Sequence, residues 1–349
     1  MTNSFEKIDI LSLFYNELEG EIIKIGEPKF RAKQIYSWIN KGKWDNEMVN
    51  IPTALRIKLN DHFLWALPTV ERKLVSKIDG TIKYLFKLHD GEFIESVFMK
   101  YEHGNTLCIS SQVGCRMGCK FCASTLLGRV RNLMPSEMLG QIIAAEKDTG
   151  ERISNVVMMG IGEPLDNYDN TIKFLRLVSD ENGLNIGLRH ISVSTCGLVD
   201  KINDLANESL PVTLSISLHA YDNETRSQTM PINNKYPIEV LLDACQKYFE
   251  KTSRRISFEY TLIAGQNDTD EGAVRLAKIL KKYIKSPCHV NLIPLNEVKE
   301  TGLGTSKNVN NFKNKLLSLG INATVRRRLG ADINASCGQL RRGAKEERV

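Results

Sequence analysis

The stretch Cys115-Arg116-Met117-Gly118-Cys119-Lys120-Phe121-Cys122 places three thiols at a C-x3-C-x2-C spacing. Thiolates this close together can ligate one metal centre. A structural zinc site normally closes with four protein ligands. A cubane iron–sulfur cluster held by only three cysteines keeps one iron open for another ligand. The aromatic ring of Phe121, directly before the last cysteine, suits the apolar wall that such a cluster needs.

Two other interpretations of these cysteines stay open on spacing alone. They could form part of a zinc site that His103 or Cys108 completes. They could also be unrelated buried thiols, since free cysteine is among the most buried residue types. We expect the iron–sulfur cluster, because the spacing departs from the usual zinc spacings.

The composition is that of a globular protein without membrane segments. The 349 residues are enough for about two domains, or for one barrel with additions. Charged residues make up 25% and hydrophobic residues 42% of the chain, and no apolar run approaches the roughly 20 residues of a membrane span. The first residues lack the pattern of a signal peptide. We therefore expect a cytoplasmic protein whose eight cysteines serve metal binding or catalysis rather than structural disulfides.

The charge balance permits a nucleic-acid partner without requiring one. The chain has 47 Lys and Arg against 41 Asp and Glu, a formal net charge of +6. Basic residues flank a late cysteine, Cys337, and others lie near two N-terminal tryptophans. Such clusters could equally be solvated faces. The residues concerned are Arg326 to Arg328, Arg341, Arg342, Lys29, Arg31, Lys33, Trp38 and Trp44.

The hydrophobic pattern divides the chain into four parts. Residues 1–70 predict short helices, including 30–39 and 47–67, with Ile8, Leu11 and Phe14 at helical spacing. Such a basic and aromatic module suits an RNA-binding accessory domain, or equally a docking domain or a cap. Residues 71–105 predict a β-hairpin extension, with strands 83–88 and 93–99 around the turn Asp90-Gly91. Residues 106–331 form the predicted core, and residues 332–349 a C-terminal segment that carries Cys337 and a basic tail.

Strands and helices alternate through the predicted core, an arrangement typical of parallel strands with crossover helices. We expect an α/β fold with a partial (β/α)6 barrel and with active residues at the C-terminal ends of its strands. The predicted strands are 106–110, 155–159, 190–194, 212–218, 256–262, 290–293 and 323–326. The predicted helices begin near Ser136 and continue at 168–180, 198–206, 237–251, 270–284 and 308–319.

Polar residues follow several of these strands. Glycines in Gly160-Ile161-Gly162-Glu163-Pro164 let the backbone approach a ligand, and Glu163 offers a carboxylate to an ammonium group. Ser194, Ser217-Leu218-His219 and Asn296 end later strands. Any one of them could be an ordinary cap, but together they predict one polar ligand across the strand ends.

The remaining cysteines fall into two groups. Cys196, Cys245 and Cys288 lie in apolar surroundings and are expected to pack as small hydrophobic residues. Cys108 lies on the strand that enters the cysteine loop, so we expect it near the active site. Cys337 lies in a small-residue segment that can bring a thiol to the barrel mouth, and its reactivity depends on its surroundings.

Taken together, these residues closely resemble those of the RlmN/Cfr family of radical-SAM RNA methyltransferases. The resemblance covers nearly the whole chain, from the N-terminal helical module to Cys337-Gly338-Gln339-Leu340. It implies two cofactors: a 4Fe–4S cluster on Cys115, Cys119 and Cys122, and S-adenosylmethionine (SAM), which the open iron binds and the cluster's electron cleaves to a radical. The SAM contacts implied by the resemblance are Gly162, Glu163, Ser194, Ser217, Leu218, His219 and Asn296.

The resemblance also implies how a methyl group reaches an adenine. One SAM methylates Cys337, and the radical from a second SAM removes a hydrogen atom from that methyl group, whose carbon adds to the base. Cys108 then attacks Cys337, and the disulfide that forms releases the product, so the two thiols must come within disulfide reach. Glu95 aligns with the family's proton acceptor, although the sequence alone also allows an exposed strand residue.

Within the family, Pro164, Ala123-Ser124-Thr125 and the stretch from Arg129 to Leu133 resemble RlmN. The resemblance therefore implies C2 methylation of an adenine in 23S rRNA at the peptidyl-transferase centre, and of the adenine 3′ of the tRNA anticodon. Both bases must be unstacked to react. The alternative is Cfr-type C8 methylation, which confers antibiotic resistance. Asn334 and Ser336 depart from the family's pattern around Cys337, which affects the fine positioning of that loop.

The expected partners are these RNAs and an electron donor such as flavodoxin or ferredoxin, and we expect a monomer. Two functions of other classes compete with this prediction. One is a radical-SAM enzyme with a protein or small-molecule substrate, and the other is a metal-stapled RNA-binding module without catalysis.

Overall fold

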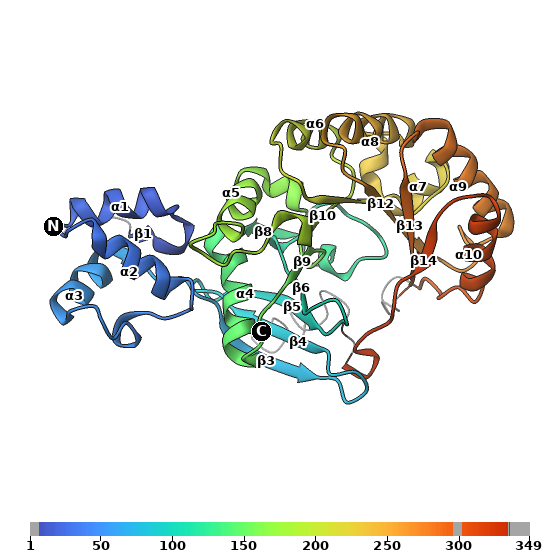
Figure 1. The fold of residues 1–349 in the computed structure, drawn as a ribbon. Helices are drawn as coiled ribbons and strands as arrows, with labels where there is room; N and C mark the ends of the chain where they lie inside the picture. The colour runs from blue at the N-terminus through green and yellow to red at the C-terminus, as the bar shows by residue number, and fades with distance from the viewer. Residues whose placement is uncertain (1–6, 296–301, 334, 336–349) are drawn as a thin grey trace.

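One ten-stranded sheet organises the protein in the computed structural model, which describes residues 7–295, 302–333 and 335 (Figure 1). Its order is β14-β13-β12-β11-β10-β9-β6-β5-β4-β3, and the neighbours from β14 to β6 run parallel. The parallel strands are β6 (Thr106–Cys108), β9 (Asn155–Met158), β10 (Ile191–Thr195), β11 (Thr213–Ser217), β12 (Ile256–Leu262), β13 (Cys288–Pro294) and β14 (Ala323–Val325).

Helices connect these strands and cover the outer face of the curved sheet (Figure 1). This arrangement confirms the predicted partial (β/α)6 barrel. The connecting helices are α4 (Pro135–Thr149), α5 (Tyr168–Val178), α6 (Val199–Asn207), α8 (Ile238–Thr252), α9 (Asp270–Tyr283) and α10 (Val309–Ser318). None of the helices in the described part of the chain combines the length and the apolar composition that crossing a bilayer requires.

One helix of the barrel, α7 (Asn223–Thr229), was not predicted. Its sequence is polar throughout and carries no apolar period. It forms because the side chain of Asp222 accepts a hydrogen bond from the amide of Thr225, at 2.8 Å, and so caps its first turn. The helix also contains Arg226, and burial of this side chain holds the helix against the barrel.

The central strand β12 shows how the sheet separates core from site. Every residue of this strand is buried, which is typical of parallel strands covered on both faces. Phe258 and Tyr260 belong to the main hydrophobic cluster, whereas Ser257, Glu259 and Thr261 alternate with them and face the other way. The barrel therefore has an apolar outer layer and a polar interior on this strand.

Three antiparallel strands extend the same sheet. They are β3 (Thr69–Val75), β4 (Ile82–Lys87) and β5 (Phe93–Met99), and β5 pairs with β6 so that Val97 lies opposite Cys108. The turn Asp90-Gly91 joins β4 to β5 as predicted. Because side chains alternate along β5, Glu95 and Val97 lie on the face of Cys108, and Ser96 points to α4 and donates a hydrogen bond to Gln141 at 2.7 Å.

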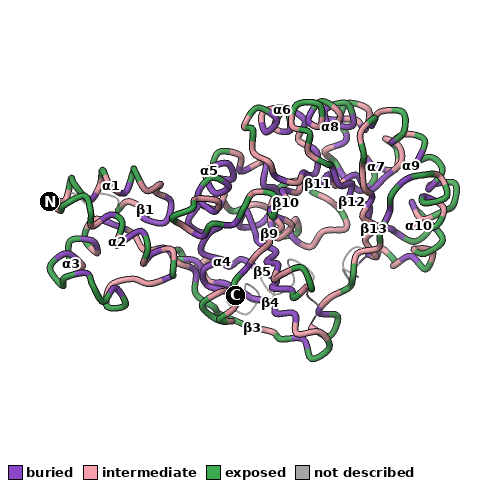
Figure 2. Tube along the Cα trace, viewed as in Figure 1, coloured by how far each residue is buried: buried purple, intermediate pink, exposed green. Residues whose placement is uncertain are grey.

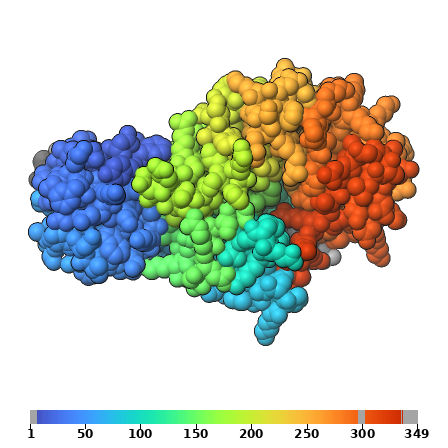
Figure 3. Space-filling view, in the orientation of Figure 1, coloured from blue at the N-terminus to red at the C-terminus, as the bar shows by residue number. Residues whose placement is uncertain are grey.

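The N-terminal residues form a helical lobe beside the barrel (Figures 1 and 3). It contains α1 (Tyr15–Lys24), α2 (Phe30–Ile39) and α3 (Thr53–His62), and a short parallel pair of β1 (Ile8–Asp9) and β2 (Phe63–Leu64). The prediction for 30–39 is confirmed. The prediction of a helix over 47–67 is wrong at both ends, because Pro52 precedes the first turn and Phe63 becomes extended to pair with Ile8. Ile8 is likewise in a strand and not in a helix.

The lobe packs on the barrel through a shared core, so that buried residues continue from one to the other (Figure 2). A polar contact lies at this junction. The carboxylate of Asp9 accepts hydrogen bonds from Ser12, at 2.8 Å, and from Ser136 at the start of α4. Burial raises the pKa of Asp9, and the two hydroxyl donors oppose that rise.

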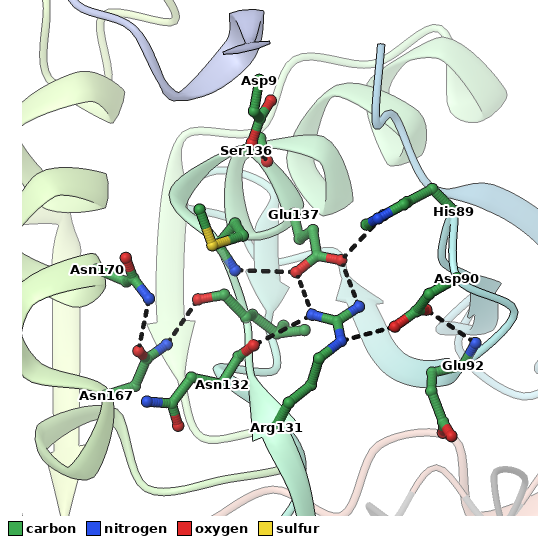
Figure 4. Close-up of polar contacts among 12 residues, drawn as sticks. Asp9, His89, Asp90, Glu92, Arg131, Asn132, Ser136, Glu137, Asn167 and Asn170 are labelled. Carbon is green, nitrogen blue, oxygen red and sulfur yellow. Dashed lines mark hydrogen bonds and ion pairs between the residues drawn. The ribbon is translucent and has the colours of Figure 1, made fainter. Parts of the chain in front are cut away.

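A buried ion pair joins the hairpin to the core (Figure 4). Arg131 contacts both carboxylate oxygens of Glu137 at 2.7 Å, and its Nε contacts Asp90 in the β4–β5 turn at 2.7 Å. Glu137 also accepts the amide of Met134, which caps α4. The Glu137 side chain is 1% exposed, so its charge depends on these donors.

We predict that Glu137→Gln lowers the free energy of unfolding by about 3 kcal/mol, because the amide that replaces the buried carboxylate cannot accept both hydrogen bonds from the half-buried guanidinium of Arg131. Urea denaturation measures this loss. Glu47→Gln is the matched control, since Glu47 pairs with Lys147 at the surface and should cost less than about 1 kcal/mol. Equal losses in the two variants would contradict the prediction.

Candidate active site

The three cysteines lie on a loop that a small antiparallel sheet closes at its base. The sheet pairs β7 (Gln112–Gly114) with β8 (Arg129–Asn132), and the amide of Cys115 donates to the carbonyl of Gly128 at 3.1 Å. Inside the loop, the hydroxyl of Thr125 donates to the carbonyl of Cys122 at 3.0 Å. The sequence did not predict this sheet, because its strands are short and β8 is polar.

All three thiols line one pocket, together with residues of β9, β10, β11, β12 and β13. Burial, and then the charge of neighbouring groups including Cys122, raises the pKa of Cys115 to about 12. Burial and the charges of Cys122 and Cys115 also raise the pKa of Cys119. Thiolates here therefore need a positively charged partner, which the irons of a cluster provide. Lining residues include Cys115, Cys119, Phe121, Cys122, Gly162, Glu163, Ser194, Ser217 and His219.

The number of thiols in this pocket suits a cluster. Cys115, Cys119 and Cys122 all line it, and a cubane held by three cysteines keeps one iron open for another ligand. The residues considered for completing a zinc site also lie elsewhere. His103 is exposed and stacks on Tyr101, and Cys108 lines a different pocket.

Glu163 and Gly162 shape the floor of the cysteine pocket. One oxygen of the Glu163 carboxylate accepts the amide of Leu165 at 3.0 Å, and the other accepts the amide of Cys196 at 2.7 Å. Burial raises its pKa, and these donors oppose the rise. The side chains of Thr195 and Cys196 also hydrogen-bond to this carboxylate, whose charge suits a ligand's ammonium group. Gly162 has a φ of +110°, and a Cβ there would lie 2.7 Å from the amide nitrogen of Gln112.

His219 lines the pocket, and its backbone lies in the left-handed region with a φ of +55°. Its Nδ1 accepts the amide of Thr261 at 2.9 Å, so a neutral ring carries its proton on Nε2. The edge of the ring meets Phe121, with centroids 4.8 Å apart. Burial, and then the charge of Arg226, lowers the pKa of His219 to about 3. The ring is therefore a neutral hydrogen-bond donor.

Not every predicted SAM contact lines this pocket. The side chain of Leu218 is buried in the hydrophobic core instead, and its amide donates to the carbonyl of Glu259 at 3.1 Å. Asn296 lies outside the described residues. The other predicted residues, Gly162, Glu163, Ser194, Ser217 and His219, lie together along the pocket.

Three polar residues that line the same pocket were not predicted to do so. They are Glu259, Thr261 and Arg326, of which Arg326 was noted only as part of a basic cluster. The carboxylate of Glu259 accepts hydrogen bonds from Asn291 at 2.7 Å and from Ser257 at 3.0 Å. Burial raises its pKa, and the charge of Arg326 opposes the rise. The signal was present, because polar residues at every second position of a buried strand point to a polar interior.

The interpretation of Cys196 as a packed hydrophobic residue needs correction, because it lines the cysteine pocket. Burial, and then the charge of Glu163, raises the pKa of its thiol well above the usual value, so it stays protonated. The interpretation holds for Cys245, which is fully buried in the main core.

A second pocket contains Cys108, which is 4% exposed and clusters with Val97 and Met99, and Ala335 packs against this cluster. Arg326, Arg327 and Arg328 line this pocket too. Both pockets share Met159, Ile293 and Arg326 in their walls, so they adjoin. Cys337, the predicted methyl carrier, lies outside the described residues, as do Asn334 and Ser336.

Glu95 is buried behind Cys108, so the alternative of an exposed strand residue is wrong. Its carboxylate lies 3.1 Å from the ammonium nitrogen of Lys83 on the neighbouring strand, and both side chains are 1% exposed. The hydroxyl of Ser110 donates to the carbonyl of Glu95 at 2.6 Å. Glu95 does not line either pocket.

We predict that Gly162→Ala weakens SAM binding by at least about tenfold, since a side chain at this φ is strained and would displace Gln112. Equilibrium dialysis with SAM measures the change. Gly20→Ala is the control, because a Cβ at Gly20 meets nothing within 4 Å. Unchanged affinity in Gly162→Ala would show that this turn does not contact SAM.

We also predict that the imidazole of His219 stays neutral from about pH 5.5 to about pH 8, because its pKa is depressed well below that range. Histidine-labelled NMR spectra of the metal-free protein test this. The same protein unfolded in urea serves as the comparison, since histidines of an unfolded chain titrate near a pKa of about 6.5. A midpoint near that value for His219 would contradict the buried, amide-bonded ring.

Comparison with known proteins agrees with this geometry. Residues 109–277 match the profile of the Radical SAM superfamily, and residues 8–64 match the ribosomal RNA large subunit methyltransferase N-terminal domain. The matched superfamily uses a 4Fe–4S cluster and SAM, so these are the cofactors of this chain.

Similar proteins extend over almost the whole length. A probable dual-specificity RNA methyltransferase RlmN of Alkaliphilus oremlandii is 56% identical over 97% of this chain and 98% of its own. The protein of the same name from Clostridium tetani is 52% identical over 97% of both chains. A crystal structure of a radical SAM methyltransferase from Sphaerobacter thermophilus is 42% identical, with a TM-score of 0.90 over 95% of this chain and 98% of that one. This chain therefore belongs to the RlmN family of radical-SAM RNA methyltransferases.

Proposed function

We propose that this enzyme methylates C2 of an adenine in 23S rRNA at the peptidyl-transferase centre, and of the adenine 3′ of the anticodon in tRNAs. The observation that carries the proposal is the common wall of Met159, Ile293 and Arg326 between the pocket of the three cluster cysteines and the pocket of Cys108. The two pockets therefore adjoin, so a group held in the second would lie beside the chemistry that the cofactors would supply in the first. RlmN relatives at 52–56% identity favour C2 over Cfr-type C8 methylation.

In this proposal, Cys115, Cys119 and Cys122 hold the cluster, and Gly162, Glu163, Ser194, Ser217 and His219 hold SAM. The bound cluster and SAM together supply the one-electron chemistry that removes a hydrogen atom from a methyl group. Glu163 binds the ammonium group of SAM, and the Gly162 backbone allows the close approach. Neutral His219 donates a hydrogen bond without adding a charge that would repel the sulfonium. Leu218 contributes through its backbone, and Asn296, which follows β13 in the sequence, completes the set.

Cys337 carries the methyl group and Cys108 resolves the product. Ala335 packs against the cluster of Val97, Met99 and Cys108, and two residues of chain span at most about 7 Å. A tether of this length is compatible with the disulfide that the proposal requires between Cys108 and Cys337. C2 of adenine is a poor nucleophile, so the methyl group must reach it through a carrier thiol and a radical. Attack of Cys108 on the sulfur of Cys337 then releases the methylated base.

Glu95 accepts the proton in this scheme, and the ammonium group of Lys83 holds its carboxylate in position. Because Glu95 lies behind the pocket wall, substrate binding must bring it into reach. Arg326 to Arg328 supply positive charge around Cys108, where the flanking phosphates of an unstacked nucleotide pass.

The expected organisation follows from the same proposal. Residues 1–70 act as the RNA-binding accessory domain, 71–105 as the hairpin extension, 106–331 as the catalytic barrel and 332–349 as the carrier segment. The enzyme works as a monomer in the cytoplasm, and flavodoxin or ferredoxin reduces it.

We predict that anaerobic incubation with SAM, a reductant and RNA from a strain without the native enzyme yields 2-methyladenosine. Mass spectrometry of the nucleosides measures it. Cys337→Ala abolishes the product because no carrier remains, and Cys108→Ala stops at a covalent protein–RNA adduct because no thiol resolves it. Cys122→Ala loses iron and SAM cleavage.

The matched control is Cys288→Ser at the opposite, N-terminal end of β13, which should retain full activity. Formation of 8-methyladenosine would move the protein to the Cfr-type reaction. SAM cleavage without any methylated nucleoside would sink the RNA proposal and favour a protein or small-molecule substrate. Product formed normally by Cys108→Ala would exclude its role in resolution.

A further inference from the structure

The outer side of the cysteine loop carries a hollow of its own. It lies on the solvent side of the loop, between the loop, the end of α7 and the segment after β12, and its lining includes Lys120, Thr125, Leu126, Gln228 and Gln266. Thr125 also lines the cysteine pocket on the inner side. Its hydroxyl donates to the carbonyls of Cys122, at 3.0 Å, and Cys119, at 3.4 Å. The loop that holds the thiols is therefore a single layer of chain between the two spaces.

The segment that holds the cysteines carries basic residues and no acidic residue. The sequence from His103 to Ser136 contains no Asp or Glu, although it contains Arg116, Lys120, Arg129 and Arg131. Arg116 and Arg129 pair with Asp166, and Arg131 pairs with Asp90 and Glu137. Lys120 is exposed and has no carboxylate partner among the residues described. The hollow's lining thus presents one available cation and no carboxylate.

The loop also exposes apolar side chains. Leu126 is 45% exposed and Leu127 is 44% exposed, at its outermost turn. Exposed leucines beside a cation are typical of a protein interface, where an apolar centre excludes water and charge selects the partner. A phosphate backbone gains nothing from leucine contacts. The pocket of Cys108, where the RNA base must react, shares no lining residue with this hollow.

We propose that this hollow is the docking site of an acidic one-electron carrier protein that reduces the cluster. The inference rests on the proposed function, which requires an external electron. Electron transfer slows steeply with distance, and here only the loop itself separates a docked carrier from the thiols. One electron leaves the reduced carrier and one is taken up by the cluster, so no bond forms or breaks in this step. Docking on the outside leaves the inner pocket to SAM and RNA.

Charge exchange at the two exposed glutamines tests the site, because glutamate and glutamine have the same shape. The variants are Gln228→Glu with Gln266→Glu, and Gln228→Lys with Gln266→Lys. The probe is flavodoxin, an acidic carrier of one electron. Calorimetry measures its affinity for the cluster-loaded enzyme, and stopped-flow absorbance measures the rate of cluster reduction by flavodoxin hydroquinone. Dithionite, a small-molecule reductant, provides the rate of SAM cleavage without docking.

We expect the Glu variant to bind flavodoxin about tenfold more weakly and to be reduced correspondingly more slowly, and the Lys variant to bind more tightly. Raising the salt concentration should shrink both differences. Dithionite-driven SAM cleavage should be the same in both variants and in the unchanged protein. Gln246→Glu on α8, a residue outside the hollow, is the matched control and should leave flavodoxin binding unchanged. Leu126→Asp should weaken binding by removing the apolar contact.

Two results would overturn the docking site. One is flavodoxin affinity and reduction that stay the same in the Glu and Lys variants. The other is a changed affinity for RNA with unchanged flavodoxin binding, which would assign the surface to the nucleic acid. Failure of the proposed function would give a different result, because the unchanged protein would then make no methylated adenosine even with dithionite. Flavodoxin binding and cluster reduction would still differ between the Glu and Lys variants if the hollow is the docking site.

Discussion

The buried guanidinium of Arg226 is the interaction on which the active site depends. It is fully buried and donates hydrogen bonds to the carbonyls of Cys196 at 2.6 Å, of Ser217 at 3.2 Å and of Leu218 at 3.2 Å. One side chain therefore ties together the ends of β10 and β11, which line the cysteine pocket. Burial lowers its pKa to about 10, so it stays charged at neutral pH. Its charge also helps to keep His219 neutral.

The rest of the site follows from burying polar groups that must still be satisfied. If the Glu163 carboxylate moved, the amides of Leu165 and Cys196 would lose their hydrogen-bond acceptor. The ring of His219 is held by the amide of Thr261. The ligand-facing atoms are thus held by backbone contacts of the strands themselves. Such a site is pre-organised, because its residues have little freedom to lose when a ligand binds.

The fold could be predicted wherever one physical rule acted alone. Alternation of apolar strands and helices gave the six βα units, and Asp90-Gly91 gave the hairpin turn. Prediction failed where tertiary contacts overrode the local pattern. Helix α7 has no apolar face. It forms because Asp222 caps its first turn and because the side chain of its own Arg226 is buried in the barrel. Phe63 was predicted to be helical, but it is in a strand because it pairs with Ile8.

By itself, the sequence determined the chemistry: three thiols at a spacing typical of a cluster, and glycine and polar residues after successive parallel strands. These are local properties, since the spacing of ligands and the period of a strand are written in neighbouring residues. Only the tertiary structure decided that Cys108 and the cluster thiols line adjoining pockets, that Glu95 is buried against Lys83, and that Glu259 and Cys196 belong to the site. Those facts depend on which strands become neighbours and how deeply each side chain is buried, and no stretch of chain specifies either alone.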